Sequence, residues 1–294
     1  MYDTVLVPTD GTEHAERAAA HAQYLATMFD ATVHVITVVD VQAAAGPFDA
    51  GGVDTAFVER LEAEGERAVA AIESTFDGDA IETAVLRGRP EEAILDYTDE
   101  HGVDLIAMGT HGRTGVNRYI SGSVTEAVVR HAEVPVLTVR KTAVSRVTEY
   151  DEIMIPTDGS AAAGAAVEHG LAVAERTDAR VHAVNVVNVS DLATGADYTL
   201  PTELLQTFQE RGQRVTEEIA AAARDRGLDA VTEVREGFPG QDLLDYAETA
   251  EIDLIAMGTA GRTGLRRFLL GSTAERVIRH ADAPVLAVTE PDEE

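Results

Sequence analysis

The sequence predicts two doubly wound α/β domains in tandem, each built on a five-stranded parallel sheet. One observation is an internal repeat, because residues 88–139 and 237–288 are identical at about half of their positions without a gap. The other is that each half alternates short β-branched or apolar runs with longer helical patterns. Strand–helix alternation gives right-handed crossovers, which is typical of a parallel sheet covered by helices on both faces.

The repeat also predicts where the domains lie. The segment Val7-Pro8-Thr9-Asp10 returns as Ile155-Pro156-Thr157-Asp158, so each half begins with the same strand and turn. This period is far longer than that of a solenoid repeat and indicates a duplicated domain. We expect one domain at residues 1–141, a polar linker at 142–149 and a second domain at 150–294.

The elements of the first half follow from its apolar periodicity. Apolar or β-branched runs predict strands at residues 4–7, 32–39, 81–86, 103–108 and 135–139. Helical spacing predicts helices at residues 13–29, 57–72, 90–100 and from 123 onward. Pro90 suits the first turn of its helix. The continuous apolar run at 103–108 is typical of a strand buried on both faces. The second half repeats this order.

The charge of the chain excludes several partners. Its 52 acidic and 23 basic residues give a formal net charge of -29. A nucleic acid or an anionic membrane surface needs a basic face, so we expect neither as a partner. No segment has the roughly 18 apolar residues of a membrane span. The first residues also lack the pattern of a secretory signal, so we expect a cytoplasmic location.

The composition also makes a prediction about salt. The chain is acidic, has no cysteine, and has Lys141 as its only lysine. Such a composition is typical of cytosolic proteins of salt-loving archaea, where self-repulsion is screened within about 3 Å at 1 M salt. The alternative is an ordinary well-solvated surface. Under the first hypothesis, the fold loosens as salt is removed.

Several kinds of chemistry are excluded. The absence of cysteine removes disulfides, thiolate nucleophiles and Cys-ligated metals. Lys141 follows Arg140 rather than a glycine, so there is no P-loop, and no lysine suits a kinase or a Schiff-base enzyme. The dinucleotide-binding fingerprint is also missing, because Asp10-Gly11-Thr12 follows the first strand.

A glycine pattern follows the fourth predicted strand of each half. It consists of Gly109, Gly112, Gly122 and Ser123 in the first half and of Gly258, Gly261, Gly271 and Ser272 in the second, with nine residues between the second and third glycine. Glycine lets a ligand approach the main chain, and a helix N-terminus offers N–H groups and partial positive charge. The pattern therefore predicts a phosphate site at the helix that each serine opens. Arg113 and Arg262 would add positive charge. The alternative is that the glycines serve tight turns and the serines are plain N-caps.

With these motifs on both halves, the chain resembles a tandem of two universal stress protein domains of the ATP-binding type, covering nearly all of its length. The resemblance implies a Rossmann-like fold of the adenine nucleotide alpha hydrolase kind. It also implies ATP or AMP as the ligand, with Mg²⁺ or Mn²⁺ at the phosphates. No carboxylate cluster in the sequence has ligand spacing of its own, so the metal is implied only through the nucleotide.

The resemblance also implies which residues contact the nucleotide. Asp10 and Asp158 would lie on the ribose and adenine side, although each is also suited to cap the next helix. The backbone of Val38 and Val186 would contact the adenine edge, and the glycines and serines would surround the phosphates. The residues expected to form the two sites are Pro8, Thr9, Asp10, Val38, Met108, Gly109, His111, Gly112, Arg113, Gly122, Ser123 and Val124 in the first half, and Pro156, Thr157, Asp158, Val186, Met257, Gly258, Gly261, Arg262, Gly271, Ser272 and Thr273 in the second.

The two halves differ at His111, which is replaced by Ala260. His111 would contact phosphate or would be an exposed loop histidine, and we expect the two sites to differ in affinity. Three functions stay open: a nucleotide-binding sensor or regulatory module, a slow ATPase in which His111 is the base, and a structural dimerisation module with vestigial sites. The resemblance further implies an intramolecular pseudo-dimer, in which the strands at 135–139 and 284–288 pair. Whether two chains also form a homodimer stays open.

Overall fold

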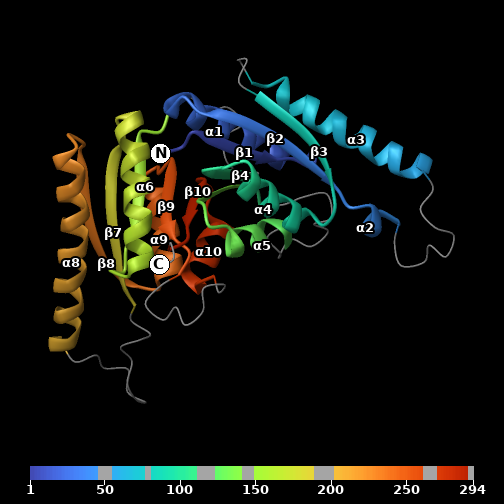
Figure 1. The fold of residues 1–294 in the computed structure, drawn as a ribbon. Coiled ribbons are helices and arrows are strands. Elements are labelled where there is room, and N and C mark those ends of the chain that lie inside the picture. Colours follow the sequence, from blue (N-terminus) through green and yellow to red (C-terminus); the bar gives the residue numbers. More distant parts are fainter. Residues whose placement is uncertain are drawn as a thin grey trace, which may run out of the picture. The chain divides into compact units, whose positions relative to one another are not determined.

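The computed structural model describes residues 1–45, 55–76, 81–110, 123–140, 149–188, 202–260 and 270–290. The chain divides into two compact units, Met1–Thr148 and Glu149–Glu294, and each is an α/β domain with helices on both faces of a sheet (Figure 1). The predicted linker at 142–149 falls almost entirely outside the described residues, so its bounds stay a prediction.

The sheet of the first unit is entirely parallel and has the order β3-β2-β1-β4-β5. Its strands are β1 (Thr4–Pro8), β2 (Thr32–Val39), β3 (Ile81–Arg87), β4 (Leu105–Gly109) and β5 (Val136–Val139). This order, in which the chain first runs one way across the sheet and then returns, is the doubly wound arrangement predicted from the sequence, and the prediction is confirmed.

Helices connect these strands. They are α1 (Glu13–Phe29), α2 (Val41–Ala45), α3 (Thr55–Glu73), α4 (Pro90–Glu100) and α5 (Ser123–His131). The bounds of α1 and α4 are those predicted. The short helix α2 was not predicted, because five residues are too few to show an apolar period. It is started by Asp40, whose Oδ1 accepts the N–H of Ala43 at 2.8 Å.

The second unit repeats the same topology, with the strand order β8-β7-β6-β9-β10 and parallel pairing throughout. Its strands are β6 (Glu152–Pro156), β7 (Arg180–Asn188), β8 (Ala230–Gly237), β9 (Leu254–Gly258) and β10 (Val285–Val288). Its described helices are α6 (Ala161–Thr177), α8 (Thr202–Asp225), α9 (Pro239–Thr249) and α10 (Ser272–His280).

The central strands of each unit are buried on both faces. In β4, Leu105, Ile106 and Ala107 are fully buried, because α1 covers one face of the sheet and α4 and α5 cover the other. In the second unit, α6 and α8 take one face and α9 packs with α10 on the other. Among the residues that the structure describes, no helix is both long enough and apolar enough to cross a membrane.

The strand orders place a topological switch between β1 and β4, and another between β6 and β9. At each switch, the chain leaves the two neighbouring strands in opposite directions, which opens a crevice at their carboxyl ends. The residues that directly follow these strands therefore meet at one edge of each sheet.

Candidate functional site

A cavity of about 360 Å³ lies at the carboxyl edge of the second sheet. Its walls come from the ends of β6, β7 and β9, from the first turns of α6, α9 and α10, and from the middle of α8. This is the switch point of the doubly wound sheet, and its volume lies within the range of about 300–1,000 Å³ typical of small-molecule sites.

The cavity brings together every predicted site residue of the second unit that the structure describes. These residues are Pro156, Thr157, Asp158, Val186, Met257, Gly258, Gly271, Ser272 and Thr273. Gly261 and Arg262 lie outside the described residues, so their placement stays a prediction. Ala260, which replaces His111 of the first repeat, also lines the cavity.

The predicted residues of the first unit lie at the equivalent edge of its own sheet. Pro8 ends β1 and is followed by Thr9 and Asp10, Val38 is near the end of β2, Met108 and Gly109 end β4, and Ser123 and Val124 begin α5. His111, Gly112, Arg113 and Gly122 fall outside the described residues. The Oγ1 of Thr125 donates to the carbonyl oxygen of Gly109 at 2.7 Å and fixes the end of β4 against α5.

The first glycine of each motif has a packing role that the sequence did not reveal. A β-carbon on Gly109 would lie 2.7 Å from the Cβ of His14, and one on Gly258 would lie 2.5 Å from the carbonyl oxygen of Ala162. Both neighbours belong to the first turn of the helix that follows the first strand. These two glycines therefore let that helix approach the strand end, whatever else the motif binds.

Each of the two predicted aspartates accepts hydrogen bonds within the turn that follows its strand. The Oδ1 of Asp10 accepts the backbone N–H of Thr12 at 3.1 Å and its hydroxyl at 2.7 Å. The Oδ1 of Asp158 accepts the N–H of Ser160 at 2.9 Å. Thr12 and Ser160 are the N-cap residues of α1 and α6, so each aspartate sits just before the cap rather than at it. Asp158 is half-buried and lines the cavity.

The first turn of α10 forms the opposite wall of the cavity. Its N-cap is Gly271, which has an extended backbone and no side chain to cap the helix. Ser272 is the first helical residue and is exposed, so it is not the N-cap, contrary to the alternative raised from the sequence. The first N–H groups of a helix have no partner within it, and here these residues line the cavity.

Several lining residues were not predicted from the sequence, and three of them bear on the shape of the site. Asn185 on β7 and Phe208 and Gly212 on α8 line the wall beyond Asp158. Asn185 is buried, and its Nδ2 donates to the carbonyl oxygen of Thr157 at 2.7 Å. A buried amide in the apolar middle of β7 was a visible signal, but its partner follows another strand, β6.

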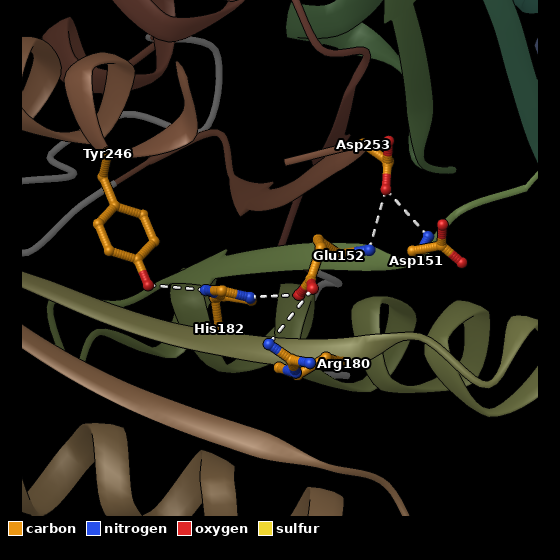
Figure 2. Close-up of polar contacts among 6 residues, drawn as sticks. All are labelled: Asp151, Glu152, Arg180, His182, Tyr246 and Asp253. Atoms are coloured by element: carbon orange, nitrogen blue, oxygen red, sulfur yellow. Dashed lines mark hydrogen bonds and ion pairs between the residues drawn. The ribbon is translucent and has the colours of Figure 1, made fainter. Parts of the chain in front are cut away.

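A separate polar cluster lies at the amino edge of the second sheet, opposite the cavity (Figure 2). His182 on β7 joins two elements: its Nδ1 is 2.7 Å from the hydroxyl of Tyr246 on α9, and its Nε2 is 2.6 Å from the Oε2 of Glu152 on β6. The other carboxylate oxygen of Glu152 lies 3.4 Å from Arg180. Burial raises the pKa of the Tyr246 hydroxyl, and nearby Glu233 adds to the effect. This network fixes α9 and two strands to one another.

Asp253 completes that amino edge. Its Oδ2 accepts the N–H groups of Asp151 and Glu152, both at 2.9 Å, and so ties the start of β6 to the start of β9 (Figure 2). Burial raises the pKa of Asp253 above its ordinary value, while the two N–H bonds act in the opposite direction. Asp104 makes the same pair of bonds to Asp3 and Thr4 in the first unit.

The fold and site define a class of protein: two Rossmann-like doubly wound domains in tandem, with a ligand-sized cavity at the switch point of the second. The model of the universal stress protein family matches residues 1–140 and 149–289. The chain therefore belongs to the universal stress protein family, with two such domains in tandem.

Several universal stress proteins are similar to this chain over part or nearly all of its length. A universal stress protein of Methanocaldococcus jannaschii is 43% identical over 148 residues, which cover 49% of this chain and 85% of the relative. The crystal structure of a universal stress protein from Archaeoglobus fulgidus is 22% identical, covers 99% of this chain and 98% of its own, and superimposes with a TM-score of 0.71. Another solved universal stress protein, which is in complex with cAMP, is 25% identical and covers 47% of this chain and 97% of its own with a TM-score of 0.34.

Proposed function

We propose that the protein binds an adenine nucleotide, ATP or AMP, and acts as a cytoplasmic sensor or regulatory module of the stress response. The observation that carries this proposal is the cavity at the second switch point, which gathers all the described residues predicted for that site. Nucleotide binding would bias whichever conformation or partner the bound state prefers. The slow ATPase stays an alternative that depends on His111, which lies outside the described residues.

The chemistry of the cavity suits a nucleotide because its lining offers both apolar surface and main-chain N–H groups. Val186, Phe208 and Leu243 line it and offer apolar surface for a purine ring. Gly258 and the uncapped first turn of α10 also line it, and there main-chain N–H groups and the helix dipole favour phosphate. The carboxylate of Asp158, another lining residue, is suited to accept hydrogen bonds from ribose hydroxyls.

A metal ion at this site would depend on the nucleotide. Within the described ranges, no group of three or more His, Cys, Asp or Glu side chains is placed to hold a metal. Mg²⁺ or Mn²⁺ would therefore be bound chiefly through phosphate oxygens, as the sequence implied. This arrangement also suits a strongly acidic protein, because the ion would lower the negative charge of an incoming triphosphate.

One experiment tests the proposal on the protein as purified. Denaturation releases bound small molecules, which ion-exchange chromatography then identifies and counts against the chain. We expect one or two adenine nucleotides per chain, or, if the protein is purified empty, a rise in melting temperature on adding ATP with MgCl₂. Protein that carries no nucleotide and shows no thermal shift with ATP or AMP would favour the structural dimerisation module instead.

Two variants of one residue test the role of the main chain. Ser272→Pro removes an N–H at the first helical position, where proline is tolerated, and the ψ of 144° at Gly271 suits a residue before proline. Ser272→Ala keeps the N–H and removes only the hydroxyl. We expect the proline variant to weaken ATP binding by roughly tenfold or more, as the loss of a charge-assisted hydrogen bond does, and the alanine variant to weaken it less. Equal binding by the proline variant and wild type would exclude the proposed phosphate site.

A further inference from the structure

We propose that the two repeats are unequal and that the second unit holds the tighter nucleotide site, with Asn185 as a positioning residue and Arg211 as an added source of positive charge. This inference rests on the proposed function, because it concerns the same site. It is carried by two positions at which the repeats differ. Thr37 stands in the first unit where Asn185 stands in the second, and Glu64 stands where Arg211 stands.

The equivalence of these positions is structural as well as sequential. A β-carbon on Gly65 of α3 would lie 2.8 Å from the Cγ2 of Thr37, and one on Gly212 of α8 would lie 2.5 Å from the Oδ1 of Asn185. In both units a helical glycine therefore makes room for the same position of the second strand. The residues that directly precede these glycines, Glu64 and Arg211, consequently occupy the same place on their helices.

Asn185 holds the turn that carries Asp158. The N–H of Thr157 donates to the carbonyl oxygen of Val184 at 2.9 Å, and the carbonyl oxygen of Thr157 accepts from the Nδ2 of Asn185 at 2.7 Å. That carbonyl belongs to the peptide bond leading into Asp158. Both main-chain polar groups of Thr157 are thus bonded to β7, which restrains the turn that carries the Asp158 carboxylate before any ligand arrives.

The first unit has only one of these two bonds. The N–H of Thr9 donates to the carbonyl oxygen of Ile36 at 2.8 Å, as in the second unit. Thr37, however, is too short to reach across as Asn185 does, and no side chain in the described part of the chain donates to the Thr9 carbonyl. The turn that carries Asp10 therefore lacks this restraint.

Arg211 supplies charge at the same turn. A β-carbon on Gly159 would lie 3.6 Å from the Nη2 of Arg211 and 3.9 Å from its Nε, so the guanidinium lies beside the residue that follows Asp158. No ion pair or hydrogen bond of Arg211 to another described residue is present. Arg211 does not itself line the cavity, but the next residue, Gly212, does, so the charge of Arg211 lies at the margin of the cavity and can attract an anionic ligand, in a chain where acidic residues outnumber basic ones by 52 to 23. The equivalent Glu64 has the opposite charge and would repel the same ligand.

The two contributions respond differently to salt. The interaction of Arg211 or Glu64 with a polyanion is Coulombic, and the screening length falls from about 8 Å at 0.15 M to about 3 Å at 1 M salt. The hydrogen bond of Asn185 is buried and short-ranged, so its effect on affinity depends little on salt. Salt dependence therefore separates the charge from the positioning effect.

The charge is tested by calorimetric titration of the full chain with ATP and MgCl₂ at about 0.2 M and about 2 M KCl. We expect Arg211→Glu to weaken the tighter site by roughly tenfold at the lower salt and by much less at the higher salt. Glu64→Arg should tighten the weaker site. Arg224→Glu is the control for charge, because it makes the same charge change on the same helix about 20 Å away, also breaks the exposed Arg224–Glu217 ion pair, and should leave both sites unchanged.

The positioning role is tested by Asn185→Thr, which installs the residue of the first unit, and by Gly212→Ala, which displaces the Asn185 carboxamide without removing a polar group. We expect either change to weaken the tighter site by roughly tenfold at both salt concentrations, the size expected when one hydrogen bond is lost. Gly164→Ala is the control for the glycine change, because a β-carbon there meets nothing within 4 Å. If Asn185 acts through Asp158, a double variant that combines either change with Asp158→Asn should lose less binding free energy than the sum of the two single losses.

The outcomes separate this inference from the proposed function. Wild type that binds neither ATP nor AMP contradicts the proposed function itself. If wild type binds, but Arg211→Glu and Asn185→Thr leave the tighter site unchanged while Glu64→Arg alters it, the first unit is the tighter site and the inference is wrong. Circular dichroism and melting curves of each variant establish that the compared proteins are folded. We expect Asn185→Thr to fold, because Thr37 already occupies that position in the first unit.

Discussion

Gly258 faces the first turn of α6 so closely that a β-carbon on it would lie 2.5 Å from the carbonyl oxygen of Ala162 and 3.0 Å from the backbone nitrogen of Ala163. These neighbours are main-chain atoms, which cannot rotate away as the end of a side chain can. The motif glycine thus fixes the distance between β9 and α6, and with it the width of the cavity at the carboxyl ends of the strands.

Gly258→Ala is therefore expected to destabilise the second unit as well as to alter its cavity. Forcing a methyl group against packed backbone costs about 1–3 kcal/mol of unfolding free energy. Thermal or denaturant unfolding measures this loss. Gly164→Ala, on the exposed side of the same α6, should instead be neutral or stabilise the helix by up to about 1 kcal/mol. A Gly258→Ala variant that melts like wild type would show that the glycine serves only the ligand.

Asp253 offers a second test, because its carboxylate joins the starts of β6 and β9 by accepting two backbone N–H groups (Figure 2). Asp253→Asn keeps an oxygen acceptor and should cost less than about 1 kcal/mol, whereas Asp253→Ala removes the acceptor of both N–H groups and should cost about 1–3 kcal/mol, the net contribution expected of two hydrogen bonds. Denaturant unfolding at neutral pH compares the two. Equal losses would mean that the two hydrogen bonds contribute nothing to stability.

The raised pKa of Asp253 adds a pH dependence with a definite sign. Because burial makes the folded protein hold this proton more tightly than the unfolded chain does, ionisation of Asp253 lowers stability as pH rises past its ordinary pKa of 3.8. Asp253→Asn should remove this contribution. The difference in unfolding free energy between wild type and Asp253→Asn should therefore shift in favour of wild type as pH falls from neutral toward 4. A difference that does not change with pH would contradict the assigned burial effect.

His34 is expected to make the first unit sensitive to mild acid. It is buried, and burial lowers its pKa from the ordinary 6.5, while Glu82 on β3 opposes this effect and His101, the C-cap residue of α4, adds to it. The unfolded chain then takes up the proton more readily than the folded one, so stability falls as pH drops below about 6.5. Tyr97, also on α4, lies 3.1 Å from the Nδ1 of His34.

The measurement is the melting temperature between pH 7 and pH 5 for wild type and His34→Gln. We expect wild type to lose more stability over this range than the variant, which cannot titrate at this position. His131→Gln changes an exposed histidine at the end of α5 and serves as the control. Parallel pH profiles of wild type and His34→Gln would show that His34 does not carry the effect.

The sequence predicted the topology but not the contacts between elements. The bounds of α1 and α4 follow from local signals, namely a long apolar period and a proline at the first helical position. The buried runs in β4 and β9 follow from the same kind of signal. The packing role of Gly109 does not, because its neighbour His14 is distant in the chain and close only after folding.

The candidate site was predicted to the extent that its residues directly follow strands. Parallel strands bring their carboxyl ends to one edge, which explains why Asp158 and Gly258 line one cavity. Asn185 and Gly212 were missed because their roles depend on the approach of α8 to β7, which no local pattern encodes. The binding role of these residues, and the pairing of the strands at 135–139 and 284–288, stay predictions.

The composition predicts that the stability of the fold depends on salt, because the formal net charge of the chain is -29. Repulsion among carboxylates opposes the compact state and is screened by salt. Salt also weakens ion pairs such as Arg130–Glu126 and Arg279–Glu275, but exposed pairs contribute only about 0–1 kcal/mol each and engage few of the 52 acidic residues. The melting temperature should therefore rise with KCl, by roughly 4–8 °C for each 2 kcal/mol gained.

Near the sequence pI of about 4.5 the net charge vanishes, so the same titration should show a much smaller effect there. A melting temperature that stays flat from about 0.1 to 2 M KCl at neutral pH would contradict the predicted salt dependence. An equal rise at both pH values would show that the salt dependence has a cause other than charge.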